Sequence, residues 1–252
     1  MNFRLTFTRI STTVIFLISI HLVGYTNEND STVNRIFTLI YNQQFREAEK
    51  SLEEHNNQLQ PFYNNVLQLD LYWWKYSLSR SKEDAKKLNE ILAKFAKTSI
   101  NSREEKINEL IVLSYQMRYE IKRYNVIGAY LLRSDASKRI EVLKMSDLSI
   151  FGDRQKLFNL YLSLFDYFDN VVNPFSFGRK SDEFLESLKV LEKYSLDYDL
   201  ILSTMAHYYL GRIYTKVEKQ PEKGQAHFKI LAQRFPKNIL FKQLSEGLNP
   251  KF

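Results

Sequence analysis

The side chains that could do chemistry in this sequence are few and widely spaced. Outside the first thirty residues there are three histidines, His55, His207 and His227. His207 and His227 fall on two helices of one predicted pair and could approach each other. Two histidines without a nearby third ligand make a weak metal site, because protein zinc sites use at least three protein ligands. We therefore expect no metal ion and no other cofactor.

Close pairs of acidic residues occur, such as Asp166 with Asp169 and Asp197 with Asp199. The first two lie on one helical face, because they are three residues apart. General acid catalysis needs a carboxyl group whose pKa is raised in a cleft, and surface acids are the simpler interpretation of both pairs. The chain has no cysteine, no glycine-rich phosphate loop and no H-E-x-x-H or G-x-S-x-G motif. The sequence therefore predicts no catalytic residue and a protein that is not an enzyme.

The composition indicates a helical globular protein. Its 252 residues include only 7 glycines and 5 prolines. Because tight turns draw on these residues, their scarcity predicts long helices joined by short loops. The formal net charge is +7, but the basic residues are interspersed with acids, as in residues 82–87. A nucleic-acid-binding surface needs a one-sided basic stripe, so no nucleic-acid partner is expected.

The first 25 residues have the arrangement of a secretory signal peptide. Arg4 and Arg9 precede an apolar run over residues 10–25, and the chain becomes polar at Thr26. Without these two arginines the chain carries +5. The apolar run is shorter than the roughly 20 residues of a spanning helix. We expect export to the periplasm or the cell envelope. An uncleaved membrane anchor at residues 10–25 and a buried first helix are the alternatives.

Residues 26–252 are expected to form a single α-helical domain. Apolar residues recur every three or four positions, which is the period of a helix. The predicted helices cover residues 31–42, 44–57, 62–79, 82–97, 102–124, 126–145, 153–172, 181–194, 198–218 and 221–235, with a short eleventh at 238–247. Consecutive helices with short loops pack as antiparallel neighbours. The aromatic stripe that runs from Leu157 to Phe168 is expected to lie in the core.

A recurring pattern is present near the end of the chain. It consists of Leu210, Gly211, Tyr214, Phe228 and Pro236. Their spacing resembles the tetratricopeptide repeat (TPR), a helix–turn–helix of about 34 residues with the pattern W-x2-L-G-x2-Y…A-x3-F…P. His207 stands where the family has tryptophan, Gly224 stands where it has a small alanine, and the turn is one residue longer. A second match, to the later half of a repeat, lies at Phe45, Ala48 and Leu52, so the resemblance covers about a quarter of the chain.

The resemblance implies an all-α fold, a right-handed antiparallel helix-pair solenoid of about ten helices. The clearest repeat spans residues 204–238. Small residues are needed where the two helices of a pair cross, so Gly211 and Gly224 are expected at this crossing, flanked by Tyr214 and Phe228. The alternative is an isolated glycine that bends its helix.

The resemblance also implies a binding groove on the concave face of the solenoid. The family's groove positions fall on Met205, Tyr208, Arg212 and Lys216. In this interpretation Tyr208 stacks on a peptide, and the two cations hold a carboxylate. In the alternative, Tyr208 packs on a neighbouring helix and the cations are solvated.

The function predicted from the sequence is that of an exported, non-enzymatic TPR-like scaffold that binds proteins or peptides at the cell envelope. Two alternatives come from other classes. One is an enzyme or carbohydrate-acting protein on a helical superhelix, which a deep cleft with unpaired carboxylates would favour. The other is a structural assembly subunit, which large exposed apolar flanks would favour.

Overall fold

The structure is a computed structural model that describes residues 28–96, 103–144, 154–172 and 182–248. These residues form α-helices and no strand, which confirms the predicted all-α class. The helices are α2 (Glu28–Tyr41), α3 (Phe45–His55), α4 (Pro61–Ser79), α5 (Lys82–Ala96), α6 (Arg103–Lys122), α7 (Val126–Lys144), α8 (Gln155–Val172), α9 (Asp182–Ser195), α10 (Leu200–Lys216), α11 (Pro221–Arg234) and α12 (Ile239–Ser245). The predicted targeting segment, residues 1–25, lies outside the described residues.

Local signals explain where several helices begin. Pro61 and Pro221 occupy the first turns of α4 and α11, where the missing N–H would have no partner in any case. The Asp199 carboxylate accepts the N–H of Leu202 at 2.9 Å. This cap makes α10 begin at residue 200, two residues later than predicted.

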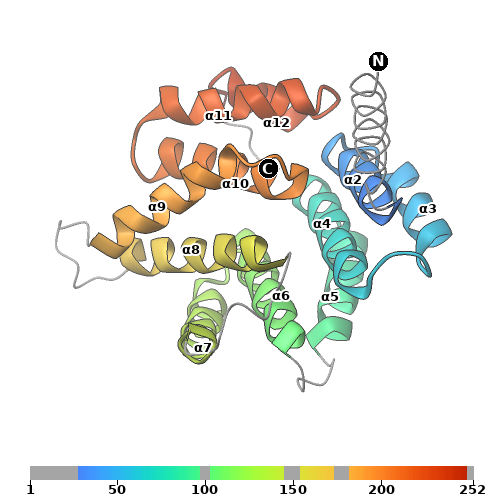
Figure 1. Cartoon of the computed structure of the whole chain (residues 1–252), viewed down its shortest axis with the longest axis horizontal. Coiled ribbons are helices and arrows are strands. Elements are labelled where there is room, and N and C mark those ends of the chain that lie inside the picture. Colours follow the sequence, from blue (N-terminus) through green and yellow to red (C-terminus); the bar gives the residue numbers. More distant parts are fainter. Residues whose placement is uncertain (1–27, 97–102, 145–153, 173–181, 249–252) are drawn as a thin grey trace, which may run out of the picture.

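The helices pack in adjacent pairs that follow one another around a common centre (Figure 1). Each even-numbered helix from α2 to α8 contacts the next even-numbered helix, and α10 contacts α2. The helix-pair solenoid therefore returns to its own beginning. The even-numbered helices face the interior, and α7 lies on the outer side of α6.

Aromatic side chains fill the interior of this ring. Phe241 of α12 is fully buried. Its ring centroid lies 5.8 Å from that of Trp74, 6.2 Å from that of Tyr208 and 6.3 Å from that of Tyr41. These partners belong to α4, α10 and α2, so the last helix closes part of the space that an open solenoid would present as a groove. The predicted α8 stripe is also buried, except that Phe168 at its end is exposed.

A hydrogen-bonded contact joins the two ends of the described chain. The side-chain amide of Asn238, which is 1% exposed, donates to the Tyr41 carbonyl at 2.6 Å and accepts from Gln43 at 3.0 Å. The Lys237 N–H donates to the Asn42 side chain at 3.1 Å. These bonds span about the full length of the described chain, so they depend on ring closure.

Gly211 and Gly224 lie where α10 and α11 cross. A Cβ at Gly211 would come within 2.7 Å of the Phe228 ring, and a Cβ at Gly224 would lie 2.8 Å from the Gly211 carbonyl oxygen. Both distances are too short for a side chain, so the close approach of the helices requires glycine at each position. Tyr214 packs beside the crossing with its ring stacked on His227, and Leu210 is fully buried, while Pro236 is exposed after the helix.

Candidate functional site

The predicted groove residues of α10 lie along the interior of the ring, at different depths. Met205 is 2% exposed and belongs to the core, so it has no surface to offer a peptide. Tyr208 is half-buried and packs edge-on against Trp74 at 5.7 Å. The guanidinium of Arg212 lies over the Tyr208 ring at 5.7 Å, and Lys216, one turn further, is exposed.

Two cations of α6 extend this set across the interior. The guanidinium of Arg118 lies between two rings, 4.4 Å from the Tyr115 centroid and 5.1 Å from that of Tyr209. Tyr209 belongs to α10, so side chains of α6 and α10 meet although α8 lies between these helices in the ring. Lys122 is one turn beyond Arg118 on the same face of α6. We call Arg118, Lys122 and Arg212 the interior cations.

The electrostatics of Lys122 show how close the positive charges are. Burial and, to a smaller extent, the charges of Arg80 and Arg212 together lower the pKa of the Lys122 ammonium to about 8. Like charges disfavour the protonated form, because each cation raises the electrostatic potential at the others. The cations at this end of α6 and α10 are therefore close enough to act on one another.

Arg118 and Arg212 are held by aromatic rings rather than by carboxylates. Neither forms an ion pair with a described acidic residue, and one terminal nitrogen of Arg118 is buried without a hydrogen-bond partner. The hydroxyl of Tyr161, which is 1% exposed, is likewise buried and unpartnered. Buried polar groups are normally satisfied by protein or water, and these two groups interact: burial raises the pKa of the Tyr161 hydroxyl, while Arg118 opposes the shift.

Asp70 is the acid that lies nearest to this set, in the deepest part of the interior. It is 1% exposed and accepts hydrogen bonds from the hydroxyls of Tyr115 and, at 3.5 Å, Tyr41. Burial raises the pKa of Asp70 to about 6, although both hydrogen bonds and the charge of Arg118 oppose the shift. Asp70 lines neither of the two cavities described here, and its hydrogen bond holds Tyr115 beneath Arg118.

The two histidines of the last repeat do meet. The Nδ1 atoms of His207 and His227 are 2.8 Å apart, so one nitrogen donates and the other accepts. Burial and, to a smaller extent, the charges of His227 and Arg234 together lower the pKa of His207 to about 4. Among the described residues no group of three His, Cys, Asp or Glu side chains could hold a metal ion.

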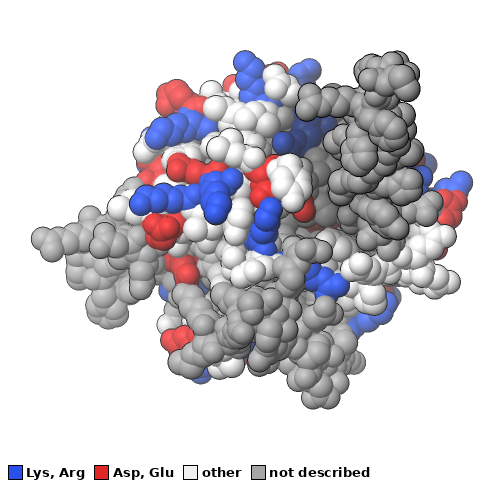
Figure 2. Space-filling view, in the orientation of Figure 1, with Lys and Arg blue, Asp and Glu red and all other residues white. Residues whose placement is uncertain are grey.

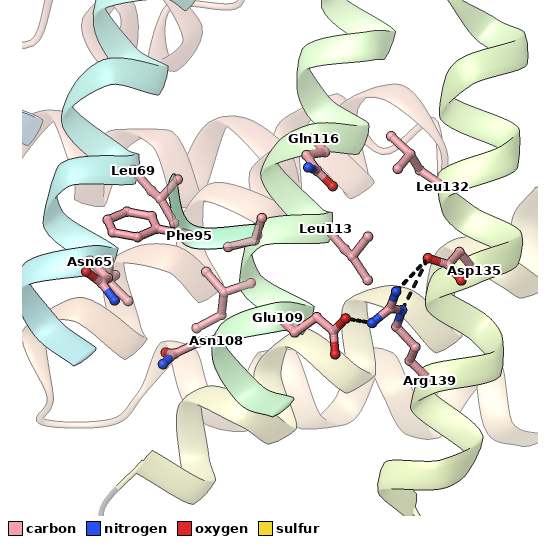
Figure 3. Close-up of a pocket in the computed structure, with 13 residues that line it drawn as sticks. Asn65, Leu69, Phe95, Asn108, Glu109, Leu113, Gln116, Leu132, Asp135 and Arg139 are labelled. Atoms are coloured by element: carbon pink, nitrogen blue, oxygen red, sulfur yellow. Dashed lines mark hydrogen bonds and ion pairs between the residues drawn. The ribbon is translucent and has the colours of Figure 1, made fainter. Parts of the chain in front are cut away.

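A cavity of about 180 Å³ lies between α4, α5, α6 and α7 (Figure 3). Its floor is apolar, with Leu69, Phe95 and other side chains. On the α7 side Arg139 pairs with Glu109 and donates to Asp135 at 3.1 Å. Both carboxylates of the cavity are therefore partnered, which does not suit a general acid or base.

The acidic pairs noted in the sequence have structural contacts. Asp197 forms an ion pair with Lys156 at 2.8 Å, and the hydrogen bond from this lysine lowers the pKa of Asp197. Asp199 is the cap of α10. Asp166 is half-buried on α8, and the side chain of Asp169 lies outside the described set.

Sequence reasoning singled out Tyr208, Arg212 and Lys216, which remain a prediction, and it did not single out Asp70 or the α6 cations. A signal was present: Asp70 stands between leucines within an apolar helix, and Arg118 stands between two tyrosines. A charge that shares a stripe with apolar residues faces the interior. The pattern does not reveal that the stripes of α4, α6 and α10 converge.

On the outer surface the charges are mixed. Over α9, α10 and α11, Lys and Arg are interspersed with Asp and Glu (Figure 2). Within the described ranges, none of the helices has the length and apolar character needed to cross a membrane. Comparison with known proteins found no match among protein-family models, curated proteins or solved structures.

Proposed function

We propose that the protein is an exported, non-enzymatic, TPR-like scaffold at the cell envelope that binds acidic segments of other proteins or peptides. The observation that supports this proposal is the convergence of Arg118, Lys122 and Arg212 on one side of the ring, where aromatic rings hold both arginines and the charges of Arg80 and Arg212 act on the lysine. Exposed Lys216 extends the positive surface outward.

The chemistry of these groups fits a carboxylate. An arginine guanidinium donates two parallel hydrogen bonds to a carboxylate, and such charge-assisted bonds are about twice as strong as neutral ones. In a half-buried site these bonds are screened less by salt than at an open surface. Tyr208, which packs against Trp74 and Phe241, holds the guanidinium of Arg212 in place for such a contact.

The enzyme alternative draws less support from the described residues. Its distinguishing feature would be a cleft with unpaired carboxylates, whereas Glu109 and Asp135 of the α4–α7 cavity both pair with Arg139. Asp70 has the raised pKa of a general acid, but it lies outside both cavities. A scaffold role requires neither feature.

The test is direct binding of labelled peptides to the full chain. A peptide of repeated Glu-Gly units should bind, a Lys-Gly peptide of equal length should not, and added salt should weaken the binding. The double variant Arg212→Gln, Lys216→Gln should bind the acidic peptide at least ~10-fold more weakly, because each charge-assisted bond contributes about 1.5–3 kcal/mol.

A matched control separates the site from net charge. The double variant Lys229→Gln, Lys242→Gln removes the same charge from exposed positions of α11 and α12 and should bind like the wild type. Equal losses in both double variants would mean that only net charge matters. That outcome, or binding of the Lys-Gly peptide, would reject the proposed site.

A further inference from the structure

A group of large apolar side chains stands exposed at the end of α6 and the start of α7. The exposed fractions are 61% for Ile121, 78% for Tyr124, 76% for Ile127, 60% for Tyr130 and 62% for Leu131. The last three are spaced i, i+3 and i+4, so they share one face of α7. We call these five residues the α7 patch. Proteins rarely leave such a contiguous apolar surface exposed unless it binds something.

Positive charge surrounds the α7 patch. The guanidinium of Arg80 lies 5.9 Å from the centroid of the Tyr124 ring, and Lys122 and Arg123 separate Ile121 from Tyr124 in the chain. Glu120 is the acid of this turn, and it already pairs with Arg123 at 3.8 Å and accepts from Asn125 at 2.5 Å. Whatever covers the patch must therefore combine an apolar layer with negative charge.

The position of the patch favours a flat surface over a groove ligand. Helix α7 lies on the outer side of the ring (Figure 1), and neither described cavity includes a residue of the patch. A bound peptide helix needs a groove for its apolar side chains, whereas a bilayer accepts a protruding apolar face at its headgroup boundary. A symmetric dimer through this patch would bring the cations of both copies together, which costs free energy.

We propose that the α7 patch is a peripheral contact with an anionic lipid bilayer. Ile127 and Leu131 enter the boundary between headgroups and acyl chains. The tyrosines Tyr124 and Tyr130 keep their hydroxyls at the headgroup level, as amphipathic aromatic side chains do. Arg80 and Arg123 contact the lipid phosphates. This surface adjoins the interior cations, because Lys122 lies in the turn that carries Ile121 and Tyr124. The protein would thus hold an acidic partner beside a membrane.

A site-specific fluorescent label tests this contact. The chain has no cysteine, so Tyr130→Cys in the full chain provides one labelling position for an environment-sensitive fluorophore. Lys229→Cys, on exposed α11, is the matched control. The probes are vesicles of phosphatidylcholine alone and vesicles that also contain phosphatidylglycerol. Because a label reports its own surroundings, attachment of the vesicle through another part of the chain does not produce the signal.

The expected result is a blue shift at position 130 with the anionic vesicles and none at position 229. Substituting Arg80→Gln and Arg123→Gln in the labelled chain should weaken the apparent vesicle affinity at this label by about fivefold for each cation. These side chains are exposed, so folding should be retained and can be checked by circular dichroism.

A blue shift that appears without vesicles as protein concentration rises would replace the proposal by self-association. A shift with the Glu-Gly peptide but not with vesicles would replace it by an acidic protein partner, and no shift at all would overturn it.

Discussion

At the scale of single residues, the interior of the ring contains ionisable side chains whose charged forms are disfavoured by burial. Burial raises the pKa of Asp70 to about 6, which corresponds to about 3 kcal/mol against the charged form. This cost would be larger without the hydroxyls of Tyr115 and Tyr41 and the cation of Arg118, because each of them lowers the pKa of Asp70. Removing either charged group alone would leave the other buried without compensation, which is the expensive case for buried ions. These residues therefore act as a set that positions the rings beneath the interior cations.

The histidine pair makes a prediction about pH. The pKa of His207 is lowered to about 4, below the value of about 6.5 for an unfolded chain. The unfolded state therefore binds more protons, and stability falls as pH decreases below 6.5. We expect the wild type to lose about 1–2 kcal/mol more between pH 7 and pH 5 than His207→Gln does. Urea unfolding of both proteins at the two pH values measures this difference.

The other titratable and charged groups that face the His207–His227 pair are the same in the wild type and in His207→Gln. Arg234 acts on His207, and Glu192 acts on His227 and accepts from Tyr214. Asp70, whose raised pKa changes stability in the opposite direction, is present in both proteins. An identical pH dependence of the two proteins would contradict this prediction, because it would show that His207 binds its proton equally well in the folded and the unfolded chain.

At the scale of elements, the crossing of α10 and α11 rests on glycine. A single glycine in a helix costs about 1 kcal/mol relative to alanine, but the Phe228 ring lies where a Cβ of Gly211 would be. The loss in helix propensity is therefore offset by packing, since the two helices come close enough to bury Phe228 completely.

Gly211→Leu should overpack this crossing and destabilise the protein by about 1–3 kcal/mol. The double variant Gly211→Leu, Phe228→Ala removes the ring that the new side chain meets. It should therefore lose less stability than the sum of the two single variants. Thermal and urea unfolding of all four proteins give the coupling free energy. Strictly additive losses, or a stable Gly211→Leu, would be inconsistent with contact at this crossing.

At the scale of the whole molecule, ring closure distinguishes this chain from an open solenoid. In an open array each repeat contacts only its neighbours, so the two ends are energetically independent. Here α10 contacts α2, and Asn238 bonds the Tyr41 carbonyl. The two ends of the described chain therefore share a stability that neither has alone.

Asn238→Ala should weaken both ends together. It leaves the Tyr41 carbonyl without the side-chain donor that bonds it and removes the cap on the Phe241 N–H, at a cost of about 2–4 kcal/mol. Hydrogen exchange should then accelerate in α2 as well as in α12. Asn34→Ala, an exposed change on α2, is the control and should leave exchange unchanged. Faster exchange in α12 alone would indicate that the ends are independent.

The sequence by itself determined the class of fold, the order of helices and much of the α10–α11 crossing. Helical period, Pro61, Pro221 and the Leu210–Tyr214 pattern are local signals, and each acts within one or two turns. They also brought Arg212 and Tyr208 onto one stripe, since residues four apart share a helix face.

Only the tertiary structure decided what that stripe faces. The meeting of Arg118 with Tyr209, the burial of Asp70 and the bond from Asn238 to Tyr41 join helices that are far apart in the chain. Their geometry depends on the curvature that accumulates over successive helix pairs. A small rotation at each packing contact adds up around the ring, so no single segment of the sequence encodes whether the ends meet.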